Sequence, residues 1–153
     1  MNSLGSPPRL ATLDDRPAIE GIVEEAYSPY IERMGRKPGP MLDDYGALIR
    51  EGRVYVLDRD GALRAYVVLL PLSDAMLLDN VAVASAARGH GLGKIMMVFA
   101  EAKAREAGFS IIRLYTHETM VENIALYQRA GYRETRRVEE MGFRRVYMEK
   151  PLD

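Results

Sequence analysis

One stretch, residues 77–94, constrains the fold more than any other part of the chain. It begins with strand-forming residues that include Val81 and Val83, and small residues follow them. The chain then runs Arg-Gly-His-Gly-Leu-Gly over 88–93, and apolar residues recur at helical spacing from Leu92 onward. The pattern predicts a strand, a short turn, and a glycine-rich loop that opens a helix.

A junction of this kind favours binding of an anion. The first N–H groups of a helix have no partner inside the helix, and the helix dipole adds partial positive charge there. The glycines at 89, 91 and 93 carry no Cβ atoms, so a phosphate can approach several N–H groups at once. Arg88 adds a permanent cation suited to phosphate oxygens. The stretch therefore predicts a phosphate-binding loop.

Two widespread phosphate motifs do not fit this loop. A dinucleotide fingerprint needs G-x-G-x-x-G, and Lys94 stands where its last glycine should be. A P-loop needs a hydroxyl residue after Gly-Lys to bind magnesium, and Ile95 occupies that position. The sequence thus disfavours both dinucleotide binding and ATP or GTP chemistry.

The pattern that does fit is R-x-x-G-x-G, at Arg88, Gly91 and Gly93. A second motif follows downstream, at Asn123, Ala125, Tyr127, Gly131 and Tyr132. With both motifs in this order, the chain resembles the GNAT superfamily of acyl-CoA-dependent N-acetyltransferases over residues 9–148. The resemblance implies an enzyme that moves an acetyl group from acetyl-CoA, its donor co-substrate, to a primary amine without a metal.

The resemblance also implies how the donor is held. The N–H groups of the glycine loop would bind the CoA pyrophosphate, and the edge of the strand at 80–83 would pair with the pantetheine arm. N–H groups of the same strand could stabilise the oxyanion that forms at the thioester carbonyl. The predicted donor-binding residues are Val81, Ala82, Val83, Arg88, Gly89, His90, Gly91, Leu92, Gly93, Lys94 and Asn123.

Two residues are predicted to carry the chemistry. By resemblance Tyr127 is the general acid, since a phenol with a pKa of ~10 keeps its proton at neutral pH and can give it to the leaving thiolate. Asp79 is the candidate base, because period-two alternation puts it on the face of Val81. Glu118, His117 and water remain alternatives. The chain has no cysteine, so a cysteine-bound intermediate is excluded and direct attack in a ternary complex is expected.

Composition sets further limits. The 153 residues predict a single domain, residues 1–153, with 1–8 as a flexible leader. A net charge of −1 gives no field that favours nucleic acid, and the absence of cysteine with only two histidines argues against a metal site. No apolar run approaches the ~20 residues of a membrane span, so we expect no membrane contact and a cytoplasmic protein.

The expected fold is α/β: a mixed, mostly antiparallel sheet of six or seven strands with four helices on its faces. Strands are predicted over 9–13, 53–57, 63–70, 76–83, 110–116, 132–138 and 143–149. Helices are predicted from about 16 to 28 and over 41–50, 91–107 and 119–130, the last opened by a capping box of Thr119 and Glu122. The arginine pairs at 136–137 and 144–145 should be exposed charges on edge strands.

The acceptor is not specified by the sequence. It can be the amine of a small molecule or of a peptide, and the cations Arg33, Arg36 and Lys37 hint that it carries a carboxylate. Residues 30–41 are expected to form a loop, which could wall the acceptor site. The resemblance is also compatible with a homodimer. A non-catalytic acyl-CoA-binding sensor or partner module is the alternative function, and a nucleotide-phosphate binder of another type is a weaker one.

Overall fold

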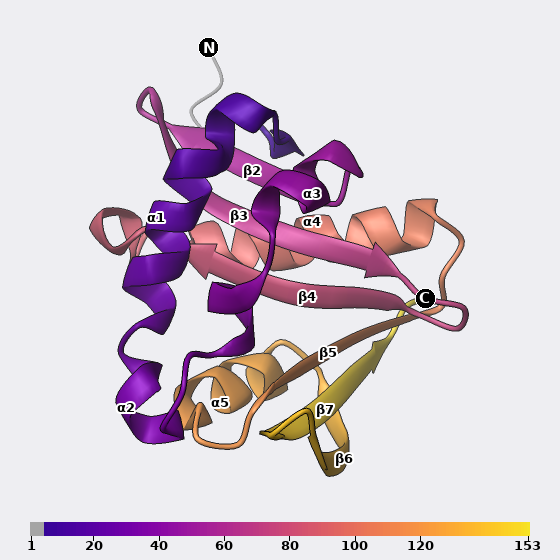
Figure 1. Cartoon of the computed structure of the whole chain (residues 1–153). Helices are drawn as coiled ribbons and strands as arrows, with labels where there is room; N and C mark the ends of the chain where they lie inside the picture. Colours follow the sequence, from indigo (N-terminus) through magenta and orange to yellow (C-terminus); the bar gives the residue numbers. More distant parts are fainter. Residues whose placement is uncertain (1–4) are drawn as a thin grey trace.

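The computed structural model describes residues 5–153, so the first four residues of the expected leader lie outside it. A seven-stranded sheet of order β1-β2-β3-β4-β5-β7-β6 forms the centre of the molecule (Figure 1). All neighbouring strands are antiparallel except β4 and β5, which confirms the predicted mixed, mostly antiparallel sheet. The strands are β1 (Arg9–Leu10), β2 (Val54–Arg59), β3 (Ala62–Pro71), β4 (Met76–Val83), β5 (Ile111–His117), β6 (Arg133–Glu140) and β7 (Phe143–Pro151).

The described chain forms five α-helices, one more than predicted. They are α1 (Arg16–Tyr27), α2 (Tyr30–Met34), α3 (Tyr45–Arg50), α4 (Leu92–Glu106) and α5 (Val121–Arg129), with 3-10 turns η1 (Leu13–Asp15), η2 (Gly39–Leu42) and η3 (Ser85–Ala87). The extra helix, α2, lies in the segment expected to be a loop. Gly35 ends it in the left-handed conformation, at φ 73°. None of the helices in residues 5–153 is long and apolar enough to cross a membrane.

The helices cover both faces of the sheet. Helices α1 and α3 lie over one face, and α4 and α5 lie over the other (Figure 1). Along β3, Val67 packs into the cluster beneath α4 while Val68 packs into the cluster beneath α1. The middle of β3 is therefore a continuous buried run, as expected for a strand covered on both sides.

Truncation of Leu114 tests the core beneath α4. Leu114 on β5 is 1% exposed, so Leu114→Ala should leave a cavity and lower the free energy of unfolding by about 2–5 kcal/mol. Val98→Ala on α4 is the control, because Val98 is 58% exposed and its loss should change stability by less than about 0.5 kcal/mol. Urea denaturation followed by circular dichroism measures both. Equal stabilities for the two variants would contradict the assignment of this core.

Candidate active site

Strands β4 and β5 separate and open a cleft in the sheet. They pair only between Met76–Leu78 and Ile112–Leu114, although both strands run on beyond this point. A β-bulge lies just past the last pair, because the β3–β4 register passes from Leu78 to Asn80 and leaves Asp79 as the extra residue. A bulge increases the local twist of a strand, which turns β4 away from β5. Two hollows lie in the resulting cleft.

The larger hollow, here called the wide groove, has a volume of about 700 Å³. It runs along the free edge of β4 from the start of α4 to α5, and α1 and α2 form its other wall. Its lining is Ala26, Tyr27, Pro29, Tyr30, Arg33, Val81, Ala82, Val83, Arg88, Gly93, Lys94, Met97, Asn123, Leu126, Tyr127, Arg129 and Ala130.

The edge of β4 offers backbone hydrogen-bonding groups to the wide groove. Ala84 N–H donates to the Arg64 carbonyl at 2.7 Å, toward β3. By alternation the amides of Val81 and Val83 point the other way, and the Tyr27 hydroxyl donates to the Val81 carbonyl at 3.2 Å from that side. Strand β5 does not pair with this part of β4, so the edge can accept an extended ligand as an additional strand.

The glycine-rich loop forms the end of the wide groove. Gly91 is the N-cap of α4 at φ 76°, and its carbonyl accepts from Ile95 N–H at 3.2 Å. The N–H groups of Leu92, Gly93 and Lys94 therefore begin the helix without partners from the preceding turn. A Cβ built on Gly93 would meet only a Val83 methyl, at 3.8 Å. The loop is thus open enough for a phosphate to reach the helix N-terminus.

The predicted donor-binding residues divide into two groups. Val81, Ala82, Val83, Arg88, Gly93, Lys94 and Asn123 line the wide groove. Gly89, His90 and Gly91 lie in the exposed turn before α4, and the Leu92 side chain is buried in the core.

Glu25 on α1 holds the turn between β4 and the glycine-rich loop in place. Ser85 in this turn donates to the Glu25 carboxylate from its backbone N–H at 2.6 Å and from its hydroxyl at 2.9 Å. These two bonds lower the pKa of Glu25.

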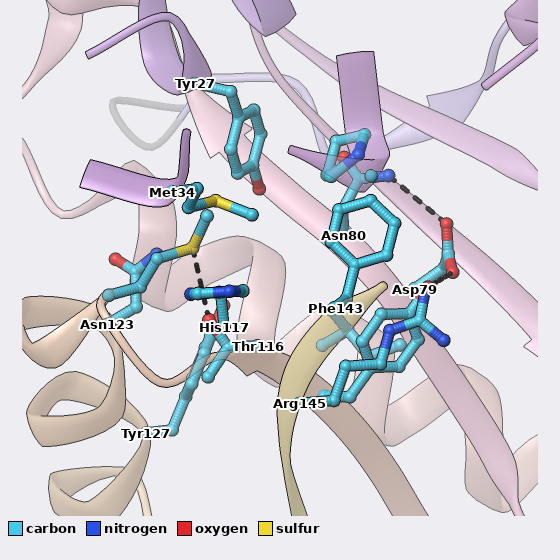
Figure 2. A pocket seen from close by; sticks show the side chains of 15 residues that line it. Tyr27, Met34, Asp79, Asn80, Thr116, His117, Asn123, Tyr127, Phe143 and Arg145 are labelled. Atoms are coloured by element: carbon cyan, nitrogen blue, oxygen red, sulfur yellow. Dashed lines mark hydrogen bonds between the residues drawn. The ribbon is translucent and has the colours of Figure 1, made fainter. Parts of the chain in front are cut away.

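The smaller hollow, here called the narrow pocket, adjoins the wide groove (Figure 2). Tyr27, Asn123 and Tyr127 line both hollows, so the two meet at these side chains. In the view of Figure 2, Asn123, His117 and Tyr127 lie on one side of the pocket, and Asp79 and Arg145 lie on the other. The remaining lining is Met34, Gly39, Pro40, Leu78, Asn80, Tyr115, Thr116, Met120 and Phe143.

Tyr127 lies at the junction on α5, one helical turn after Asn123. Its side chain is buried, and this burial raises the pKa of Tyr127 to about 12. The phenol therefore keeps its proton throughout the neutral range. A buried, protonated hydroxyl at the junction of two hollows can donate a proton to a group that becomes negative there.

Asp79 lines the narrow pocket, but the prediction that it shares a face with Val81 is wrong. The bulge interrupts the alternation, so Val81 packs toward the α4 cluster while Asp79 turns to the opposite side with Asn80. The Asp79 carboxylate accepts from the Tyr115 hydroxyl at 3.0 Å and from the Asn80 amide at 3.4 Å. It is a hydrogen-bonded carboxylate that faces the pocket.

The two alternative bases differ in placement. His117 lines the narrow pocket, but its Nδ1 accepts from Thr119 N–H at 3.2 Å, so the neutral ring carries its proton on Nε2. Burial lowers the pKa of His117, which keeps the ring neutral. Glu118 does not line the pocket and lies 3.7 Å from Arg144. Asp79 is therefore the best placed of the three to accept a proton.

Arg145 is a pocket residue that sequence reasoning missed. The pair at 144–145 was expected to be exposed on an edge strand, but β7 is an inner strand between β5 and β6. The Arg145 side chain is 15% exposed, stacks over the Tyr115 ring at 4.3 Å, and donates to Glu140 at 3.1 Å. The expectation holds for Arg136 and Arg137, which are exposed on the edge strand β6.

The segment from α2 to η2 closes one side of the narrow pocket through Met34, Gly39 and Pro40. Two of its cations, Arg33 and Arg36, make contacts within the protein. Arg33 makes two hydrogen bonds to Glu122 on α5, at 2.8 and 2.9 Å, and Arg36 stacks over Phe143 on β7 at 4.1 Å. These contacts hold the wall in place and leave the carboxylate-acceptor hypothesis without support from Arg33 or Arg36.

The predicted capping box at the start of α5 does not form. Glu122 is engaged by Arg33, the Thr119 hydroxyl contacts His117 Nδ1 at 2.9 Å, and the N-cap residue is Met120. Within residues 5–153, no group of three or more histidine, cysteine, aspartate or glutamate side chains is arranged to hold a metal ion.

Comparison with known proteins identifies the family. The model of the GNAT acetyltransferase family matches residues 19–132, and the chain belongs to this family of acyltransferases. A relative from Escherichia coli (strain K12), described as the uncharacterized N-acetyltransferase YjgM, is 31% identical over 133 residues, which cover 81% of this chain and 80% of the relative.

Solved structures share the fold. The ribosomal-protein-alanine N-acetyltransferase from Brucella melitensis superposes with a TM-score of 0.76 and 24% identity, over 96% of this chain and 100% of that one. A GNAT family acetyltransferase from Elizabethkingia anophelis, solved with acetyl-CoA bound, has a TM-score of 0.63 and 18% identity, over 75% of this chain and 86% of that one. At these identities the likeness establishes the fold.

Proposed function

We propose that this acetyltransferase moves an acetyl group from acetyl-CoA to a primary amine, by direct attack of the amine in a ternary complex. The observation that carries the proposal is the meeting of two hollows at Tyr27, Asn123 and Tyr127. The donor would occupy the wide groove and the acceptor amine the narrow pocket. The acetyl-CoA bound in the Elizabethkingia anophelis structure supports this choice of donor.

The residues of the wide groove fit such a donor. The N–H groups at the start of α4, together with Arg88 and Lys94, would hold the pyrophosphate. The free edge of β4 at Val81 and Val83 would pair with the amides of the pantetheine arm. A bound acetyl-CoA would supply an activated acyl group as a thioester.

Three groups would act on the reacting atoms. Asp79 would take the proton from the acceptor ammonium, directly or through a water molecule. An N–H group of β4 near Val81 would stabilise the developing oxyanion. Tyr127 would donate its proton to the departing thiolate, because its high pKa keeps it protonated until the thiolate forms.

A non-catalytic acyl-CoA-binding module is the alternative that the site must be tested against. A module of this kind needs the wide groove but has no use for the narrow pocket beside it. A screen of primary amines with acetyl-CoA, read by release of free thiol, separates the two functions. Amine-dependent thiol release supports the transferase, and tight acetyl-CoA binding without turnover on any amine would support the module.

A further inference from the structure

Two groups of opposite charge lie on the same side of the narrow pocket and do not pair with each other (Figure 2). Asp79 on β4 accepts from the Tyr115 hydroxyl at 3.0 Å, and the guanidinium carbon of Arg145 on β7 lies 4.3 Å from the centre of the same tyrosine ring. Among residues 5–153, Arg145 forms an ion pair with Glu140, at 3.1 Å, and none with Asp79. One tyrosine thus anchors an anion and a cation that both face the pocket.

The guanidinium of Arg145 is fixed in place, although its side chain is only 15% exposed. A second ring, that of Phe143, lies 5.3 Å from the guanidinium carbon. Glu140, which accepts from Arg145 Nη1, also accepts from the Tyr147 hydroxyl. Ring stacking and the ion pair offset the cost of burying the cation, and they hold its planar fork in one orientation.

The ion pair with Glu140 does not use up this arginine. A guanidinium carries five N–H donors in a planar fork and stays positively charged across the range in which proteins are folded. Glu140 accepts from Nη1, which leaves the edge formed by Nε and Nη2 able to make two parallel hydrogen bonds to another carboxylate. Since Arg145 lines the narrow pocket, that carboxylate can belong to a molecule bound there.

We propose that the acceptor is an α-amino acid, bound with its ammonium at Asp79 and its carboxylate at Arg145. This inference rests on the proposed function and names the class of acceptor. An α-amino acid carries both charges on one carbon atom, so it matches an anion and a cation that one tyrosine holds together. An alkylamine or a peptide N-terminus has no carboxylate at this position. Arg145 is then the residue that determines specificity.

The experiment compares natural α-amino acids with their primary amides as acceptors. Each amide keeps the amine and the side chain but has a neutral group in place of the carboxylate, as a peptide N-terminus does. Thiol release from acetyl-CoA gives kcat/KM for the acid and the amide with wild type and with Arg145→Gln. The acid-to-amide ratio should fall about 30-fold in Arg145→Gln, which corresponds to about 2 kcal/mol and is typical of hydrogen bonds to a charged group.

The comparison contains its own controls. The amine of an amide loses its proton more easily than that of the acid, but this difference cancels because both enzymes meet the same two amines. The change should lie in KM, since the carboxylate does not react. Arg145→Lys keeps the charge but loses the planar fork, and it should give an intermediate ratio. Arg136→Gln is the matched control, since Arg136 stacks over the Tyr147 ring at 4.4 Å but is exposed on β6, outside the pocket.

The outcomes separate this inference from the proposed function. An unchanged acid-to-amide ratio in Arg145→Gln, or an equal fall in Arg136→Gln, overturns the inference. A wild type that acetylates alkylamines but none of the α-amino acids also overturns it, while the proposed function then stands. If no amine of any kind is acetylated, the proposed function fails, and calorimetric titration of the protein with CoA and the amino acids decides the carboxylate site. Binding that is lost in Arg145→Gln supports the site, and absence of binding overturns it.

Discussion

Tyr127→Phe should lower kcat by about 10²-fold and leave the affinity for acetyl-CoA within twofold of wild type. The substitution removes the hydroxyl that is placed to protonate the leaving thiolate, and general acid catalysis contributes at least this much. The ring stays, so the packing of α5 against the sheet should be kept. Steady-state thiol release gives kcat, and calorimetric titration gives the dissociation constant for acetyl-CoA.

Tyr132→Phe is the matched control for this loss. Tyr132 is a second buried tyrosine, with its ring centre 6.1 Å from that of Tyr127. Its hydroxyl is buried and has no hydrogen-bond partner among residues 5–153, so its removal should keep or raise the melting temperature and leave kcat unchanged. Full activity of Tyr127→Phe across the pH range would show that another group protonates the thiolate.

Gly93→Leu should weaken acetyl-CoA binding by about 30-fold or more without lowering the melting temperature. A Cβ at this position would meet only a Val83 methyl, at 3.8 Å, and Gly93 lines the wide groove, so a leucine here should take up space that the donor needs. Loss of two backbone hydrogen bonds to the donor, at about 1 kcal/mol each, accounts for this factor. Leucine also favours a helix more than glycine does.

The control for Gly93→Leu is Gly21→Leu. Gly21 lies in α1, and no atom of another element in residues 5–153 lies within 4 Å of the place that a Cβ would take there. The same change therefore adds the same side chain to a helix away from the groove. Calorimetry and thermal denaturation on both variants separate donor binding from folding. Wild-type affinity in Gly93→Leu would contradict the placement of the donor at the start of α4.

Much of the architecture follows from local sequence signals. The strand–loop–helix unit at the centre of the fold is predicted by the alternation of β4, by the glycine loop and by the amphipathic pattern of α4. The dipeptide Asp60-Gly61 predicts the β2–β3 turn. The helical spacing of Asn123 and Tyr127 predicts that they share a face, and both line the two hollows. Signals of this kind act within a few residues, so one sequence is enough to read them.

The features that were missed depend on contacts between distant segments. The bulge at Asp79 comes from the register of β3 against β4, and it turns this carboxylate to the other side of the sheet. Arg145 is enclosed because β7 inserts between β5 and β6, which a strand pattern alone does not reveal. The capping box fails because Arg33, far away in the sequence, binds Glu122.

Helix α2 shows the same limit on a smaller scale. Its sequence is rich in proline and glycine at both ends, which predicts a loop, but five residues between Pro29 and Gly35 form a helix. Contacts of Arg33 with α5 and of Arg36 with β7 fix it over the narrow pocket.

The most direct test of the central claim is calorimetric titration of the protein with acetyl-CoA, with NAD and ATP as controls. The wide groove with its open helix N-terminus predicts saturable binding of acetyl-CoA, one molecule per chain, and much weaker binding of NAD and ATP. Addition of an acceptor amine to this complex should then release free thiol. A folded protein that does not bind acetyl-CoA would contradict the assignment of the groove, and with it the proposed mechanism.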